Sequence, residues 1–229
     1  MKKVGIDSID YRELLRGSSD YVQNEKRDAI YKVAIFLVNH FWFRPADIAD
    51  GIGVLLLVWN QALYRYCNFA LDFEELEKFL KKNEKTINTL RNRDISSLSE
   101  NDEELVKELF DELLDVLKCE DRKSPVATSK ALHLLAPSFF PIWDNDISKA
   151  YNCYWYYSEL ASEKYFKFMG KMKELSQRII QTYSDRNNVD SETAKKAICE
   201  KASENLPFTK SLLKVIDEYN YAFTKYWKR

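Results

Sequence analysis

Apolar residues recur every three to four positions along most of the chain, a period typical of amphipathic α-helices. Helix-start signals accompany this period, because Pro45, Asp72 and Asp144 each suit a first turn or an N-cap. The pattern predicts helices at 20–42, at 45–66, from 72, and at 103–118, 126–136, 145–155, 158–182, 191–204 and 208–227. In the 103–118 segment, the side predicted to be buried carries Leu105, Leu109, Leu113 and Val116.

Residues that break regular structure are scarce in this chain. It has 5 glycines and 5 prolines in 229 residues, against usual shares of about 7% and about 5%. A sandwich or barrel of many strands needs such residues at every turn, so the composition argues against one. We therefore predict an all-α fold. No repeat, low-complexity tract or long linker divides the sequence, which predicts a single domain over residues 1–229.

The net charge of −1 shows no overall preference for nucleic acid, so any DNA-binding face must be local. Charge is uneven along the chain, with a net −7 over residues 71–122 and +5 over residues 161–229. The basic C-terminal region is either a set of solvated helix faces or a surface that meets a phosphate backbone.

The four cysteines lie far apart and contain no C-x-x-C pair, and there are two histidines. This pattern predicts reduced thiols and neither a metal site nor an iron–sulfur cluster. The longest apolar stretch, 52–59, is too short to span a bilayer. The N-terminal region carries acids and lacks an apolar signal segment. We therefore expect a cytoplasmic protein that needs no cofactor and no membrane.

Two polar residues stand out in the segment 124–151. Lys130 lies on a short helix whose other residues are mostly apolar, so its amine either reaches water or is partly desolvated. Desolvation would lower its pKa and make it a nucleophile. Asp144 follows a turn held by Pro137 and Pro141, at a helix N-terminus. It is an N-cap, and an ionised carboxylate there is also suited to stabilise a nearby cation.

The run FPIWDNDISKAY (140–151) resembles the segment that carries the catalytic aspartate in helix-hairpin-helix DNA glycosylases, and most closely their adenine glycosylase branch. Upstream, VATSKALHLL (126–135) resembles the second helix of the family's hairpin, where bifunctional members carry a Schiff-base lysine. Residues 47–66 resemble the family's central helix, with Asn60-Gln61 at its end. The resemblance covers roughly residues 45–155 and extends to uncharacterised bacterial and phage-associated relatives.

This resemblance implies a bilobal helical fold with a central lobe at about 45–120, a degenerate hairpin and Asp-bearing helix at about 121–155, and C-terminal helices at 156–229 that pack with the N-terminal helices. It implies a monomer that flips a damaged or hypermodified base out of double-stranded DNA, in repair or in defence against modified phage DNA. Asp144 and Lys130 would be catalytic, with Lys130 also a candidate for Schiff-base lyase activity. The DNA-binding candidates are Gln61, Asn60, Ser124, Thr128 and Ser129. The base-pocket candidates are Trp143, His133, Trp59, Phe140 and Tyr151, each of which has a core position as its alternative.

Two other functions remain open from the sequence. A related enzyme could use the same fold and flipped-base pocket to modify a base without releasing it. A helical binding module without catalysis is the third reading, with Lys130 at a surface and Asp144 as a plain helix cap. Release of free base from DNA distinguishes the first function from the second. The third predicts that substitution of Lys130 or of Asp144 leaves every DNA-dependent activity unchanged.

Overall fold

The structure is a computed structural model that describes residues 4–25, 28–68, 70–204, 206 and 208–227. Over these residues the chain forms α-helices and short 3₁₀ helices and no strand, which confirms the predicted all-α class. The α-helices are α1 (Tyr11–Asn24), α2 (Asp28–His40), α3 (Pro45–Trp59), α4 (Gln61–Tyr64), α5 (Phe73–Lys82), α6 (Glu84–Arg91), α7 (Glu103–Val116), α8 (Pro125–Leu135), α9 (Asn145–Ala150), α10 (Ala161–Asn187), α11 (Ser191–Ala202) and α12 (Leu212–Lys225). The 3₁₀ helices are η1 (Ile6–Ser8), η2 (Arg65–Cys67), η3 (Ile95–Ser97), η4 (Glu100–Asp102) and η5 (Ser158–Leu160).

Three predicted helix starts are confirmed, two of them by capping contacts. Pro45 opens α3 at its first turn, where a missing N–H costs nothing. Asp72 caps α5 by accepting from the Glu75 backbone N–H at 3.0 Å. Asp144 caps α9 in the same way, so these side chains replace backbone acceptors that the first turn lacks.

Two predicted helices are each split in the structure. The 20–42 pattern is two helices, because α1 begins earlier and ends where Glu25 takes an extended backbone. The 45–66 pattern breaks at Asn60, where α3 and the following α4–η2 segment meet at 87°. At Asn60 the apolar period continues across the break, so the pattern alone could not reveal it. Between α1 and α2, residues 23–28 contain no apolar residue and mark the break in the sequence itself.

The buried face of α7 is rotated from the predicted one. Leu105 is exposed and Val116 is half-buried, whereas Val106 and Phe110 join the predicted Leu109 and Leu113 in the core. The last helix begins at Leu212, capped by Ser211, and not near residue 208. The apolar period locates a helix more reliably than it locates the helix's first residue or its buried face.

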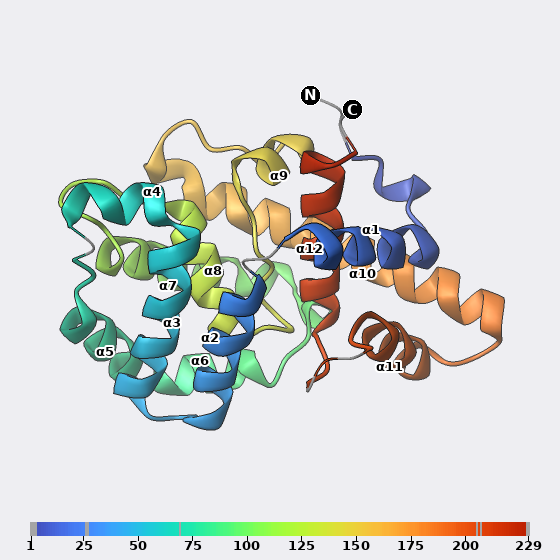
Figure 1. Cartoon of the computed structure of the whole chain (residues 1–229), viewed down its shortest axis with the longest axis horizontal. Coiled ribbons are helices and arrows are strands. Elements are labelled where there is room, and N and C mark those ends of the chain that lie inside the picture. The colour runs from blue at the N-terminus through green and yellow to red at the C-terminus, as the bar shows by residue number, and fades with distance from the viewer. Residues whose placement is uncertain (1–3, 26–27, 69, 205, 207, 228–229) are drawn as a thin grey trace.

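Figure 1 shows α2 to α7 gathered on one side of the molecule and α1, α11 and α12 on the other. The long α10 runs across both groups and contacts α7 and α11. α1 lies against α12, and Gly17 allows the close approach because a Cβ there would stand 2.7 Å from the Tyr219 ring. α8 and α9 lie towards the middle, where the two groups of helices meet.

The cysteine prediction needs one correction. Cys67 and Cys119 form a disulfide, whereas Cys153 and Cys199 are buried free thiols. The bonded pair is 52 residues apart in sequence, so its spacing gave no sign of the contact. The fold brings the end of η2 against the residues that follow α7.

Among the described helices, none is by itself long and apolar enough to cross a bilayer, and α3 with the segment after it passes that test only as a sharply bent pair. Within the same residues, no group of three or more His, Cys, Asp or Glu side chains is arranged to hold a metal ion.

Candidate functional site

A pocket of about 480 Å³ opens where α8, α9 and α12 meet the ends of α1 and α3. Its size falls within the usual range of small-molecule sites. Three lysines and four carboxylates are among its lining residues, so it combines both signs of charge. The lining residues are Tyr21, Glu25, Trp59, Val126, Lys130, Ile142, Asp144, Asn145, Asp146, Ile147, Lys149, Asp217, Tyr221 and Lys225.

Lys130 reaches this pocket from the buried helix α8. The residue is only 8% exposed, although the sequence left open whether it reaches water freely. Its ammonium donates to Asn60 Oδ1 at 2.8 Å and to the Trp59 carbonyl at 3.3 Å. It also stands 5.5 Å from the centre of the Trp59 ring. The contacts to Asn60 and Trp59, where α3 ends and the chain bends, therefore fix the position of the amine.

Asp144 enters the pocket at the N-terminus of α9. One carboxylate oxygen accepts from the Ile147 backbone N–H at 2.7 Å, which orients the side chain and stabilises its negative charge. The turn before it is anchored in the core, because the indole of Trp143 donates to the Pro125 carbonyl at 3.2 Å. The Ser129 hydroxyl is 3.3 Å from the Trp143 carbonyl and links α8 to the same turn. These bonds hold Asp144 beside the helix that carries Lys130.

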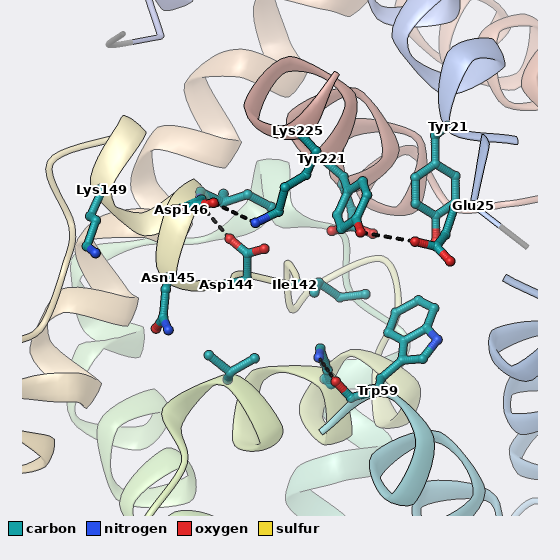
Figure 2. Close-up of a pocket in the computed structure, with 14 residues that line it drawn as sticks. Tyr21, Glu25, Trp59, Ile142, Asp144, Asn145, Asp146, Lys149, Tyr221 and Lys225 are labelled. Atoms are coloured by element: carbon teal, nitrogen blue, oxygen red, sulfur yellow. Dashed lines mark hydrogen bonds and ion pairs between the residues drawn. The ribbon is translucent and has the colours of Figure 1, made fainter. Parts of the chain in front are cut away.

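The opposite wall of the pocket is built from α12 and the end of α1. Figure 2 shows Tyr221 and Glu25 at one end, joined by a hydrogen bond of 3.0 Å from the phenol. Lys225 pairs with Asp146 at 2.5 Å and so connects α12 to α9. The Trp59 ring lies across the pocket from these residues. A flat ring facing charged side chains can hold a planar polar group between them.

Asp217 also lines this wall and is itself buried. Its carboxylate stands 3.1 Å from the ammonium of Lys214, a lysine with no solvent exposure. Burial raises the pKa of Asp217 to about 6, although Lys214 acts in the opposite direction. Burial also works to lower the pKa of Lys214, but the surrounding Tyr21, Asp217, Glu218 and Asp28 outweigh it and hold that pKa well above its usual value.

The predicted base-pocket residues do not lie together. Trp59 lines the pocket, whereas the core contains the other four, namely Trp143, His133, Phe140 and Tyr151. His133 accepts from the Tyr31 hydroxyl at 3.0 Å, and its other ring nitrogen donates to the Phe140 carbonyl at 2.8 Å. Burial lowers the pKa of His133 to about 3, so it is a neutral, hydrogen-bonded core residue.

The predicted DNA-binding residues are also divided. Gln61 is exposed at the first turn of α4, and Asn60 donates to the Ser124 hydroxyl at 3.2 Å. Asn60 and Ser124 line a second groove of about 370 Å³ that shares Trp59 and Asn145 with the pocket. Thr128 and Ser129 are buried and donate to backbone carbonyls, so we do not include them in a DNA-contacting surface.

The sequence pattern did not predict the α12 wall. Lys214, Asp217 and Glu218 were visible as three charges at helical spacing on one predicted helix. They fall on the face that also carries the apolar residues of α12, and charges on an apolar face are the available signal for a buried polar cluster. No protein-family model, curated protein or solved structure matches this chain.

Proposed function

We propose that this chain is a DNA glycosylase that cleaves the N-glycosidic bond of a damaged or hypermodified base. The observation that supports this proposal is the meeting of Lys130, Asp144 and the Trp59 ring in one pocket. The two charged residues are 14 positions apart and come from different helices, so their meeting is a property of the fold. They are also the two residues that the resemblance to helix-hairpin-helix glycosylases assigns to catalysis.

The chemistry uses each of the three residues. Trp59 stacks on the base that has left the duplex, in a pocket large enough for one nucleoside. Asp144 stabilises the positive charge that develops at the anomeric carbon as the bond to the base breaks. Lys130 attacks that carbon, and the resulting imine can lead on to strand cleavage. A nucleophile and a charge stabiliser on one sugar favour base release over simple binding.

The surroundings of the pocket suit a double-stranded DNA substrate. Asn60 and Gln61 lie where α3 bends into α4, beside the groove that adjoins the pocket. In this proposal Gln61 enters the gap that the flipped base leaves. Lys149 is exposed at the pocket's edge and is available to phosphates, whereas Lys123 lines the same groove and is paired with Asp115 at 2.5 Å. Repair and defence against modified phage DNA are the two biological settings that this activity serves.

The test is base release from genomic DNA of an unmodified host and of phages with hypermodified cytosine or thymine. Heating in alkali converts each abasic site into a strand break. We expect breaks with the native protein. For Asp144→Asn we expect a rate of base release about 10²–10³-fold lower, because the charge is lost while Asn still caps the helix. Asp72→Asn makes the same change at the N-cap of α5, away from the pocket, and should leave the rate unchanged.

Two results would contradict the proposal. One is the absence of breaks with every DNA, and the other is an Asp144→Asn protein as active as the native one. A modified base that stays attached to the DNA would instead indicate the base-modifying function. Unchanged DNA in all samples would favour a binding module.

A further inference from the structure

We infer that Asp217 is a further catalytic residue of this pocket, the general base that accepts the proton Lys130 loses before its amine attacks the sugar. The inference rests on the proposed function and extends it. An ammonium has no lone pair, so a lysine nucleophile needs a proton acceptor at the site.

Asp217 is placed on the pocket wall opposite Lys130. Asp217 lines the same pocket as Lys130 and Asp144, but it comes from α12 on the opposite wall. It is 6% exposed, so its carboxylate is largely withdrawn from bulk water while it still borders the cavity. A base in this position shares with the nucleophile a cavity where water is scarce, which strengthens electrostatic interactions across it.

The carboxylates around Lys214 share positive charge unequally. The buried ammonium of Lys214 lies 3.1 Å from Asp217, 3.5 Å from Glu218 and 3.7 Å from Asp28. Each of the other two carboxylates has a second lysine, because Lys210 pairs with Glu218 at 2.8 Å and Lys32 pairs with Asp28 at 3.6 Å. Among the ion pairs of the described residues, Asp217 has one lysine partner, Lys214, and it shares that lysine with Glu218 and Asp28.

In such a cluster, the buried carboxylate whose one cation is shared is stabilised more by binding a proton than the carboxylates that have a second lysine. Of the three acids, Asp217 is the one that lines the pocket. Proton exchange with a bound substrate is therefore open to Asp217, whereas Glu218 is enclosed by Ser18, Lys210 and Lys214.

The electrostatic environment agrees with this role. Burial raises the pKa of Asp217 to about 6, Lys214 lowers it, and Glu218 and Asp144 raise it further. At pH 7 the group is mostly a carboxylate, and its proton affinity lies close to the optimum for a base at that pH. The titratable groups that face it or share its pocket are Lys214, Glu218, Asp28, Tyr21, Tyr31, Asp144, Lys130, Glu25, Asp146, Lys149, Tyr221 and Lys225.

The step is balanced in atoms and charge. Asp217 takes one proton from the Lys130 ammonium, and the nitrogen lone pair forms a bond to the anomeric carbon. The electron pair of the N-glycosidic bond leaves with the base. The proton on Asp217 then passes to the departing base nitrogen, which restores the carboxylate. One proton has moved from the lysine to the base, and no oxidant or reductant takes part.

The experiment compares single-turnover base release by the native protein, Asp217→Asn and Glu218→Gln between pH 5 and 9. Both variants remove one carboxylate partner of Lys214, but only the first alters the pocket. We expect Asp217→Asn to release base about 10²–10⁴-fold more slowly at pH 7. Its rate should rise with pH as hydroxide removes the lysine proton. DNA affinity should be unchanged. Glu218→Gln should keep the native rate within a few-fold and the native pH profile.

The outcomes separate this inference from the function on which it rests. If the native protein releases base and Asp217→Asn does so at the native rate, the inference is wrong and the glycosylase proposal stands. Equal losses in both variants, with an unchanged pH profile, would make Asp217 a structural partner of Lys214 and would also overturn it. Without base release by the native protein, the proposed function and the inference both fail.

Discussion

The two walls of the pocket are assembled in different ways. One wall comes from α8 and α9, which lie within 26 consecutive residues and are joined by a turn bonded to α8 through Trp143 and to α9 through Asp144. The other wall comes from α1 and α12, whose facing residues Tyr21 and Tyr221 are 200 positions apart. The first wall can be recognised as a local pattern, and the second exists only when the ends of the chain pack together.

The walls also hold their charges differently. On the α8–α9 wall, Lys130 donates to an amide and a backbone carbonyl, and Asp144 accepts from a backbone N–H. On the α12 wall, Lys214 is surrounded by three carboxylates. Dipoles position the side chains of the first wall, whereas ion pairs in a low-dielectric interior hold the second together. We therefore expect the second wall to be more sensitive to the removal of a single charged side chain.

Among the tests of this difference between the walls, removal of the Lys214 ammonium has the largest expected effect on stability. Lys214→Met leaves buried carboxylates without a shared cation, and we expect it to lower the free energy of unfolding by about 3–5 kcal/mol. Lys32→Met is the matched control, because Lys32 pairs with the same Asp28 but is partly exposed. That change should cost about 0–1 kcal/mol. Urea unfolding measures both values, and equal small losses would show that the cluster does not stabilise the α12 wall.

A smaller effect on stability is expected from the hydrogen bond between His133 of α8 and Tyr31 of α2. His133 accepts from Tyr31 and stays neutral in the fold, with its pKa lowered to about 3 by burial. The unfolded chain binds a proton near pH 6.5, so this residue's contribution to stability is lost as the pH falls from 6.5 towards 3. Relative to His133→Gln, the native protein should lose about 1.4 kcal/mol per pH unit between pH 6 and 4.

The comparison with His133→Gln isolates the contribution of the histidine to the pH dependence of stability. Asp217 titrates in the same range with the opposite sign, since its raised pKa adds stability as the pH falls towards 3.8. Both proteins contain Asp217, so its contribution cancels in the difference. A difference that stays constant with pH would mean that His133 is protonated in the folded chain.

The sequence predicted the fold class and one wall because those features are local. Helix period, Pro45 in a first turn and the N-caps Asp72 and Asp144 are encoded within a few residues. The break at Asn60 and the buried face of α7 depend on neighbours distant in sequence, and the same holds for the pairing of Cys67 with Cys119. Aromatic residues gave the least information, since Trp59 and Trp143 read alike in sequence but occupy the pocket and the core.

The most direct test of the central claim is to find which lysine bonds to the sugar. The protein is incubated with a duplex that carries an abasic site, the imine is reduced with borohydride, and the labelled peptide is identified by mass spectrometry. We predict a label on Lys130 that is abolished by Lys130→Arg. The label should remain in Lys149→Arg, a change at an exposed lysine of the same pocket. A label on Lys149 or another lysine, or no label at all, would contradict this prediction.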